Sequence, residues 1–495
     1  MLLDFDACYR AVCSRDSRFD GRFFTAVTTT GIYCRPICPA QTPKPVNVQF
    51  YACAAAAEAA GFRACRRCRP ETSPGSPEWN VRADLVARAL RMIAEGVVDS
   101  DGVDGLAKRL AVSPRHLHRE LMTEVGAGPL ALARTRRAQT ARLLIDQTDL
   151  SMTSIAFAAG FESIRQFNDT MHASFGCAPL ALRKHTTTAQ QGSGEIVLRL
   201  RYRPPIAMPA LLDFFAARAI SGVEEVTTNS YSRTVQTARC RGRITLEPRQ
   251  DTATVTLRLG LEEFADLPLV VQRCRYLFDL DADWSAIADT LGRDPLLGPL
   301  VAAQPGLRIP GTVDGFELSV RAILGQQVSV ARARALATRL AERFGMPLAH
   351  PIGALTHYFP SAAALADADL EGIGLTKSRV TALKTLAQTV ARGDLVLDRG
   401  ADPAGTVAQL QALPGIGPWS ASYIALRALG DPDALPAQDL ALRHACERLG
   451  LAGDPKSIAA AAEAWHPWRG YATFLLWNSL AGSAAGQTGT VAPST

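Results

Sequence analysis

The spacing of apolar residues along the chain changes its period twice, and this divides the chain into three parts. In the first 71 residues, an apolar, β-branched run at 23–33 predicts strands, and an alanine-rich run at 52–60 predicts a helix. Residues 78–185 carry apolar positions at helical spacing throughout, so we expect this part to be all helix.

The third part begins with strands and continues as helices. Strand-like runs lie at 196–202, 241–246 and 252–259, and a helix-like run at 209–219 lies between the first two. From residue 261 onward the apolar spacing is helical and is broken by glycine and proline. The pattern therefore predicts a multidomain, mainly α protein with smaller α+β parts.

Polar stretches rich in proline, glycine or threonine mark the boundaries between these parts. The runs TSPGSP at 72–77 and TTTAQQGSG at 186–194 are typical of linkers. The small, polar end of the chain is expected to be disordered. The expected domains are 1–75, 78–185, 195–260 and 261–482, with a linker at 186–194 and a tail at 483–495.

The net charge of +6 is concentrated in the first two parts of the chain. Residues 1–191 hold 24 Lys and Arg against 18 Asp and Glu, whereas the remainder holds 29 basic and 29 acidic residues. Such an excess attracts phosphate, although an ordinary solvated surface gives the same count. The chain has no apolar run of about 18 residues and no secretory pattern at its start. We therefore expect a cytoplasmic protein that binds no membrane.

Two close cysteine pairs lie in the first part. Three residues separate Cys34 from Cys38, and two separate Cys65 from Cys68. Four thiolates in two pairs suit one tetrahedral Zn²⁺ per chain. In a cytosolic chain such pairs bind metal more often than they form disulfides. On spacing alone, the favoured interpretation is a structural zinc site that only stabilises the fold of a small domain.

The segments around these cysteines, TTGIYCRPICPA and AGFRACRRCRPE, resemble the N-terminal domain of the bacterial Ada methylation-response proteins over most of residues 4–71. The resemblance implies that Cys34 is both a zinc ligand and the acceptor of a methyl group from a DNA phosphotriester. Cys38, Cys65 and Cys68 would complete the site. The chemistry is consistent, because zinc keeps a thiol deprotonated and the thiolate is the nucleophilic form.

Methyl transfer would neutralise one thiolate and make the zinc cluster less negative. We expect this change to strengthen binding to phosphate and so to act as an electrostatic switch. Gln41 stands where the family usually has an arginine, and this difference is expected to weaken binding to DNA. A solvated loop is the alternative role for the arginines expected to contact phosphate, which are Arg63, Arg66, Arg67 and Arg69.

The all-helical part contains one turn pattern twice. An apolar helix at 103–110 is followed by the cap Ser113 and a polar helix, and the pattern returns at 155–161 with Ser163 as the cap. The repeat, with its closing GCAP, resembles the AraC-type DNA-binding domain, in which the second helix of each unit enters the major groove. Helical packing without DNA binding is the alternative. The residues expected to reach DNA are Arg115, Arg119, Arg165 and Gln166.

Near the C-terminus, Gly415 and Gly417 lie in a turn, LPGIGPW, between two apolar helices, and Asp439 follows. With RAILGQQVS at 321–329 and WHPWRGY at 465–471, these residues resemble the DNA-3-methyladenine glycosylase II family, AlkA, over about 195–481. The resemblance implies a small α/β domain and a helix-hairpin-helix domain, whose glycine turn contacts phosphate through backbone N–H groups. The residues implied to stack on the base are Trp419, Tyr423 and Trp477.

A base-excising enzyme must turn the base out of the duplex and stabilise the positive charge that grows on the sugar. The Asp439 carboxylate fits that role and can orient the attacking water, although capping a helix is its alternative role. Trp419 stands where strand-cleaving relatives have lysine, so we expect no lyase activity. Gln327 stands where the family often has a leucine wedge, and it is expected to contact DNA.

Together these features predict a fused sensor, transcription activator and repair enzyme. The resemblances to bacterial proteins imply a bacterial, nucleoid-associated protein. The expected activities are monofunctional DNA-3-methyladenine glycosylase II, acting on 3-methyladenine and 7-methylguanine, and suicidal methyl transfer from DNA methylphosphotriesters to Cys34. The expected partners are alkylated DNA, promoter DNA and RNA polymerase, and the chain is expected to be a monomer. The alternative is a transcription regulator with structural zinc and an inactive glycosylase fold that only binds DNA.

Overall fold

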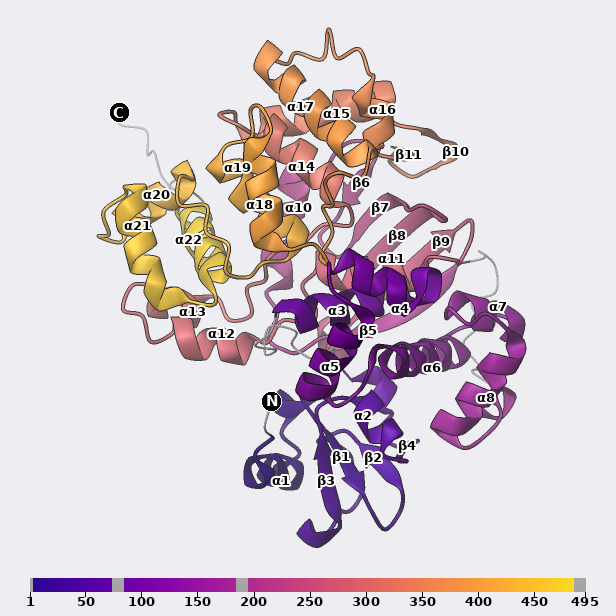
Figure 1. Cartoon of the computed structure of the whole chain (residues 1–495). Helices are drawn as coiled ribbons and strands as arrows, with labels where there is room; N and C mark the ends of the chain where they lie inside the picture. Colours follow the sequence, from indigo (N-terminus) through magenta and orange to yellow (C-terminus); the bar gives the residue numbers. More distant parts are fainter. Residues whose placement is uncertain (1–2, 74–83, 184–194, 485–495) are drawn as a thin grey trace, which may run out of the picture. The chain divides into compact units, whose positions relative to one another are not determined.

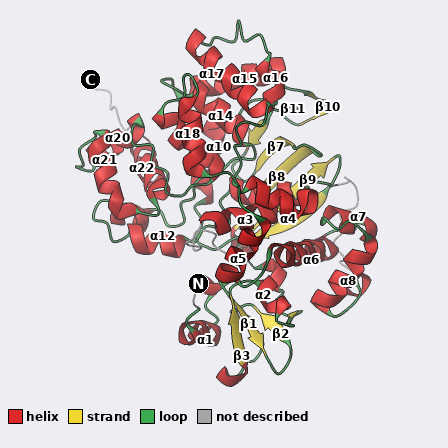
Figure 2. Ribbon diagram, in the orientation of Figure 1, coloured by secondary structure: helices red, strands yellow, loops and turns green. Residues whose placement is uncertain are grey.

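The computed structural model describes residues 3–73, 84–183 and 195–484. It divides the chain into two compact units, in which helices are the main element (Figures 1 and 2). Unit 1 comprises Met1–Arg203 and Ser232–Tyr276, and unit 2 comprises Pro204–Tyr231 and Leu277–Thr495. Most of the first expected linker, all of the second and nearly all of the expected tail lie outside the described residues. No described helix is long and apolar enough to cross a membrane.

Unit 1 begins with a small four-stranded sheet that carries the cysteine pairs. Its strand order is β3-β1-β2-β4, with β1 antiparallel to both neighbours and β2 parallel to β4. The run expected to form strands gives β1 and β2, and the alanine-rich run gives α2. The elements are α1 (Phe5–Ser14), β1 (Phe24–Val27), β2 (Ile32–Cys34), β3 (Val48–Tyr51), α2 (Ala54–Ala59) and β4 (Arg63–Ala64).

A set of helices follows, and it contains the two predicted helix-turn-helix units. The predicted caps are present: the Ser113 hydroxyl accepts from the backbone N–H of His116, and the Ser163 hydroxyl accepts from that of Gln166, each at 3.2 Å. The helices are α3 (Asp84–Glu95), α4 (Val97–Arg109), α5 (Pro114–Val125), α6 (Pro129–Gln147), α7 (Met152–Ala158), α8 (Ile164–Phe175) and α9 (Pro179–Leu182).

The cysteine-bearing sheet and the helix-turn-helix part share one apolar core. Ala55 and Ala56 of α2 belong to the same buried cluster as Leu106, Leu117 and Leu121 of the helices. Burial of apolar surface on both sides of this boundary stabilises the contact between the two parts. The linker predicted from composition gave no indication that the two parts pack against each other.

A five-stranded sheet of order β5-β9-β8-β7-β6 follows. Pairs β5/β9 and β8/β9 are antiparallel, and the predicted strand-like runs are β5, β8 and β9. Strand β7 was not predicted because its sequence, YSRTVQ, has few apolar positions to alternate. The elements are β5 (Ile196–Arg201), β6 (Glu224–Val226), β7 (Tyr231–Gln236), β8 (Arg241–Arg249), β9 (Thr254–Leu261) and α11 (Leu267–Leu277).

Unit 2 is helical around one large apolar core, to which α14, α15, α17 and α19 contribute buried side chains. The predicted turn joins α18 to α19, which is the expected helix-hairpin-helix arrangement. The elements are α10 (Met208–Arg218), α12 (Trp284–Leu291), α13 (Gly298–Ala303), α14 (Gly315–Leu324), α15 (Val330–Phe344), β10 (Pro347–Ile352), β11 (Leu355–His357), α16 (Ala362–Ala366), α17 (Lys377–Ala391), α18 (Pro403–Ala412), α19 (Pro418–Ile424), α20 (Leu440–Arg448), α21 (Pro455–Ala461) and α22 (Arg469–Ala484).

Candidate zinc site and candidate base-excision site

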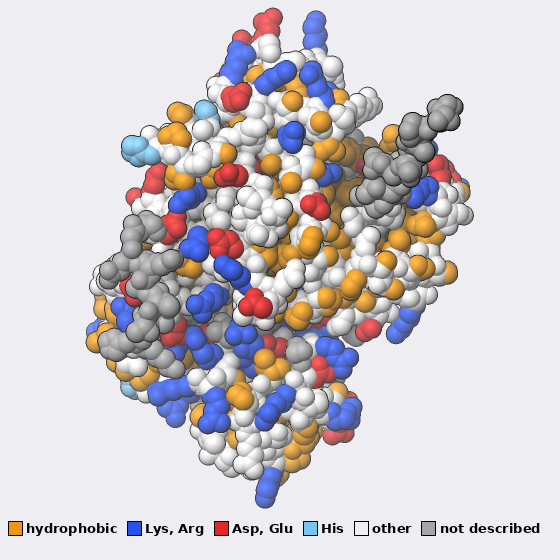
Figure 3. Space-filling model, turned by 180° about the vertical axis from the view of Figure 1, so that it is seen from behind, with side chains coloured by type: hydrophobic (Ala, Val, Ile, Leu, Met, Phe, Trp, Pro, Cys, Tyr) orange, Lys and Arg blue, Asp and Glu red, His pale blue; other side chains and the backbone are white. Residues whose placement is uncertain are grey.

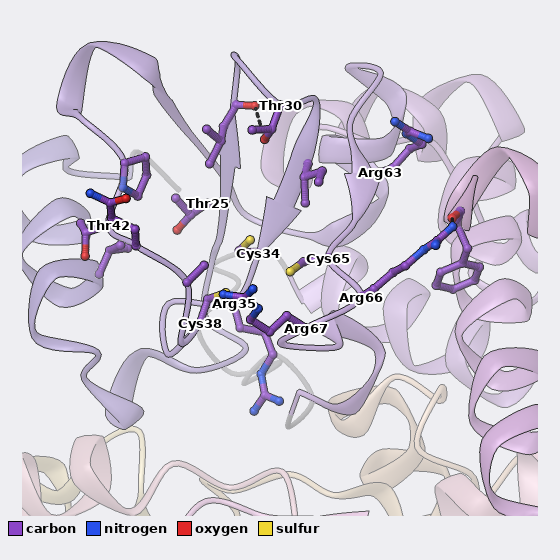
Figure 4. Close-up of a pocket in the computed structure, with 17 residues that line it drawn as sticks. Thr25, Thr30, Cys34, Arg35, Cys38, Thr42, Arg63, Cys65, Arg66 and Arg67 are labelled. Atoms are coloured by element: carbon purple, nitrogen blue, oxygen red, sulfur yellow. Dashed lines mark hydrogen bonds between the residues drawn. The ribbon is translucent and has the colours of Figure 1, made fainter. Parts of the chain in front are cut away.

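The four predicted cysteine ligands come together in unit 1. The sulfur atoms of Cys34, Cys38, Cys65 and Cys68 all lie within 4.8 Å of one another. This spacing fits one tetrahedral Zn²⁺ with zinc–sulfur distances of about 2.3 Å. Cys34 ends β2 and Cys65 follows β4, and because these strands are parallel neighbours the sheet brings the two pairs together. Figure 4 shows the sulfur atoms of Cys34 and Cys65 close to each other.

A cavity of about 650 Å³ lies beside the cysteine cluster. Arg63, Arg66 and Arg67 line this cavity together with Cys34 (Figure 4). Gln41 also lines it. All three arginine residues are exposed, so their positive charges can meet an anion that approaches the sulfur atoms. The predicted phosphate-contacting arginines thus stand beside the predicted methyl acceptor.

The four sulfur atoms differ in the hydrogen bonds they accept. The backbone N–H of Arg35 donates to Cys68 at 3.4 Å, and backbone N–H groups also favour the thiolate forms of Cys38 and Cys65. Hydrogen bonds with the other three cysteines and burial raise the pKa of the Cys34 thiol. Cys34 and Cys38 are only partly buried, whereas Cys65 and Cys68 are buried.

Arg35 is a structural residue of this site that the sequence did not reveal. Its side chain is buried and forms an ion pair with Asp20, and its Nη1 donates to the carbonyl oxygen of Cys68 at 3.2 Å. A buried, fully bonded guanidinium fixes the chain that it bridges. Arg35 therefore holds the second cysteine pair against the strand that ends at Cys34.

Two of the loop arginines also contact the helix-turn-helix part of unit 1. Arg66 Nη2 donates to the carbonyl oxygen of Phe175, at the end of α8, at 3.1 Å. The prediction that Arg69 contacts phosphate is wrong, because Arg69 forms ion pairs with Glu71 and with Asp146 of α6. Charge that is paired with buried carboxylates is not available to a DNA phosphate.

The predicted DNA-reading residues lie on the second helix of each helix-turn-helix unit. Arg115 and Arg119 are on α5, and Arg165 and Gln166 begin α8. Arg165 is almost fully exposed, with 92% of its side chain accessible. Figure 3 shows several Lys and Arg side chains on the surface in the lower part of the view.

In unit 2, the Asp439 carboxylate is bonded by two indoles. Its Oδ2 accepts from Trp419 Nε1 at 2.8 Å, and its Oδ1 accepts from Trp477 Nε1 at 2.9 Å and from the backbone N–H of Leu442 at 2.8 Å. Asp439 therefore caps α20 and also faces the predicted base-stacking residues. Tyr423 completes this aromatic group, stacked on Trp419 with ring centroids 5.5 Å apart.

The glycine turn precedes α19 directly. Gly415 has a φ of +79°, and a Cβ there would lie 2.9 Å from the Cβ of Ala382. Both the left-handed backbone conformation and the close approach of Ala382 therefore favour glycine. Gly417 caps α19, and a Cβ there would meet open space. Gln326 supports the turn, because its Nε2 donates to the Gly415 carbonyl oxygen at 2.8 Å.

Gln327, at the predicted wedge position, is exposed and has a φ of +51°. A non-glycine residue in this left-handed region is held there by its surroundings, and such strain often marks functional positions. The glutamine at this position is thus presented to solvent shortly after the end of α14.

Arg427, which the sequence did not single out, lies directly behind the aromatic group. Its Nη1 donates to the Tyr423 hydroxyl oxygen at 2.6 Å. Burial raises the pKa of Tyr423, but the positive charges of Arg427 and Arg218 outweigh it, and the net pKa of the phenol is lowered. The sequence signal that could have revealed Arg427 is its spacing. It lies one helical turn after Tyr423 and two turns after Trp419.

Four family models match successive segments of the chain. The "Metal binding domain of Ada" matches residues 7–71 and a "Helix-turn-helix domain" matches 106–185. The "AlkA N-terminal domain" matches 197–314, and the "HhH-GPD superfamily base excision DNA repair protein" model matches 320–470. With the sites described above, these matches define a class: DNA-binding repair proteins that join an Ada-type zinc module to a base-excision fold. The four cysteines are the site of one Zn²⁺.

Comparison with individual proteins identifies the family. The chain is 50% identical, over 96% of its length and 97% of the relative's, to the "Probable bifunctional transcriptional activator/DNA repair enzyme AlkA" of Mycobacterium tuberculosis. The chain belongs to this family of bifunctional transcriptional activator/DNA repair enzymes. It is also 37% identical, over 56% of its length and 95% of the relative's, to "DNA-3-methyladenine glycosylase 2" of Escherichia coli.

A solved structure shares the fold of the C-terminal part. The "3-methyladenine dna-glycosylase from Archaeoglobus fulgidus" superimposes with a TM-score of 0.50 and 21% sequence identity. The match covers 57% of this chain and 97% of that chain. At this identity the likeness shows the fold alone.

Proposed function

We propose that this protein repairs alkylated DNA at two separate sites and activates transcription in response to one of them. The observation that carries the proposal is the Asp439 carboxylate, held between two indoles at the start of α20. The zinc module near the N-terminus would perform the second reaction, in which Cys34 accepts a methyl group from a DNA phosphotriester. Base release and methyl uptake, measured on the same purified chain, test the two halves separately.

Three features of the zinc site support methyl transfer to Cys34. Cys34 is only partly buried, whereas Cys65 and Cys68 are buried, so its sulfur is more accessible to a DNA substrate than theirs. It lines a cavity that could admit a phosphotriester, with Arg66 and Arg67 beside it. Bound zinc would supply a stabilised thiolate at neutral pH. The sulfur would attack the methyl carbon, and the phosphodiester would leave as an anion next to the arginines.

Methylation of Cys34 is expected to tighten binding to DNA. The transfer removes one negative charge from the cluster beside Arg63, Arg66 and Arg67, so their attraction for phosphate is less opposed. We predict several-fold higher affinity of the methylated protein at low salt, and a difference that shrinks as salt rises. Titration of labelled duplex DNA with both forms at several salt concentrations measures it. Equal affinity of the two forms at every salt concentration would rule out the switch.

At the C-terminal site, the residues fit hydrolysis of an N-glycosidic bond. A flipped N-alkylated purine, such as 3-methyladenine or 7-methylguanine, would stack on Trp419, Tyr423 and Trp477. The Asp439 carboxylate would stabilise positive charge at the sugar carbon and take the proton of the attacking water. The glycine turn at 415–417 would hold a nearby phosphate through backbone N–H groups.

The enzyme is expected to release bases without cutting the strand. Strand cleavage through a Schiff base needs an amine at the position of Trp419, and an indole cannot form one. We predict that methylated DNA treated with this protein stays intact until the abasic sites are cleaved by alkali, and that borohydride traps no protein–DNA adduct. A strand-cleaving glycosylase serves as the positive control. A trapped adduct would show lyase chemistry and contradict the assignment.

The helix-turn-helix units complete the proposed function. Arg115 and Arg119 of α5, with Arg165 and Gln166 of α8, would contact promoter DNA in successive major grooves. We propose that the chain acts as a monomer and that RNA polymerase is its partner at the promoter. Light scattering of the free protein and a reconstituted transcription assay test these two points.

A further inference from the structure

One face of the helix that follows the glycine turn carries an aromatic surface with opposite charges at its two ends. Trp419, Tyr423 and Arg427 are spaced four residues apart along α19 and the π-helical turn that continues it, so they lie on one face. Trp419 Nε1 donates to Asp439 at 2.8 Å, and Arg427 donates to Tyr423 at 2.6 Å. Eight helical residues rise by roughly 12 Å. The carboxylate and the guanidinium therefore stand at opposite ends of the Trp419–Tyr423 stack.

The Arg427 charge is fixed in place. Its Nε donates to the carbonyl oxygen of Pro310 at 2.7 Å, and its Nη2 donates to that of Gly311 at 3.0 Å. The residue is 5% exposed, and its guanidinium carbon lies 5.5 Å from the centre of the Tyr423 ring. A charge held this way in a water-poor place acts on a neighbouring ring more strongly than a solvated one. The lowered pKa of Tyr423 reflects that field.

We propose that Arg427 stabilises the electron pair that the departing base takes with it, and that its charge aids the release of neutral damaged purines more than that of cationic ones. The inference rests on the proposed base-excision function and on stacking of the base over Trp419 and Tyr423. When the glycosidic bond breaks, both electrons go to the purine, and the sugar carbon becomes positive. A positive charge behind the base and a negative charge beside the sugar both favour this shift.

The charge on the base before cleavage determines how much Arg427 increases the overall rate of base release. A cationic N-alkylated purine leaves as a neutral molecule, and a neutral purine leaves as an anion, so Arg427 favours the cleavage step equally for both. Before cleavage, however, Arg427 repels the cationic base and leaves the neutral base unaffected. The gain for a cationic base is thus offset by weaker binding, whereas a neutral base keeps the whole gain.

Two duplexes that differ in the charge of the damaged base test this role. One carries 7-methylguanine, which is cationic, and the other carries hypoxanthine, which is neutral. Single-turnover release is measured against protein concentration for the parent, Arg427→Met and Arg427→Lys. We expect Arg427→Met to lower the saturating rate on both duplexes about tenfold. It should also bind the 7-methylguanine duplex several-fold more tightly without any gain for hypoxanthine. Arg427→Lys keeps the charge and should stay within about threefold of the parent rate.

Equal losses in Arg427→Met and Arg427→Lys, or no tightening specific to 7-methylguanine, would mean that Arg427 only supports the fold. A purely structural residue cannot improve binding of one duplex alone. If Arg427→Met does not fold, Arg427→Gln removes the charge and keeps a side chain that can bond the Tyr423 hydroxyl. Failure of the base-excision proposal would look different, because the parent itself would then release neither base.

Discussion

Replacing Asp439 by asparagine is expected to slow release of methylated purines by about 10²- to 10⁴-fold. The change removes the negative charge that would stabilise the sugar cation and accept the proton of water. It does not remove the helix cap, because asparagine caps a helix as well as aspartate does. Single-turnover release of 3-methyladenine and 7-methylguanine from methylated DNA measures the effect.

A second aspartate in unit 2 provides the matched control for this experiment. Asp454 caps α21 by accepting from the backbone N–H groups of Lys456 and Ser457, and no indole bonds to it. Asp454→Asn should release bases at the parent rate. If Asp439→Asn kept the parent activity, Asp439 would be only a helix cap, and the glycosylase assignment of this site would lose its basis.

Replacing Cys34 by alanine is expected to reduce methyl uptake from DNA methylphosphotriesters to background. The sulfur proposed as the methyl acceptor is then gone, and of the three remaining cysteines Cys65 and Cys68 are buried and less accessible to DNA. Base release by the same variant should be unchanged, because the base-excision site lies in the other unit of the chain. Transfer of labelled methyl groups to protein, counted per chain, measures the loss.

Cys13 is the control for the cysteine substitution, since it is exposed on α1 and does not belong to the cluster. Cys13→Ala should take up one methyl group per chain, as the parent does. Zinc content is measured alongside, so that a lost ligand can be told from a lost acceptor. Methyl uptake by Cys34→Ala at the parent level would assign the acceptor to another residue and leave the cluster a structural role.

The parts of the molecule that were predictable from sequence depend on local signals. Ser113 and Ser163 cap their helices as expected, because a cap is decided by the residues within one turn. The four cysteines were found because thiol pairs with short spacing have few other uses in such a chain. Strand β7 and the shared core of Ala55 with the helix-turn-helix part carry no such local signal.

The parts that were missed depend on contacts between residues far apart in the chain. Arg69 was expected at a phosphate, but Asp146, its partner, lies 77 positions further along the chain, and spacing cannot reveal that pair. Helix capping and catalysis were the two alternative roles expected for Asp439, and its contacts are compatible with both. One carboxylate oxygen caps α20, and each of the two oxygens accepts a hydrogen bond from an indole. The bond that Arg427 donates to Gly311 spans 116 positions of the chain, and the sequence does not reveal it.

We propose that one chain performs two repair reactions at two sites. The most direct measurement incubates the zinc-loaded protein with methylated duplex DNA and analyses both products of the same reaction. Chromatography of the released bases should find 3-methyladenine and 7-methylguanine, and mass spectrometry of the digested protein should find one methyl group, on Cys34. A protein that binds this DNA, yet releases no base and carries no methyl group on Cys34, would instead be a regulator with structural zinc and an inactive glycosylase fold.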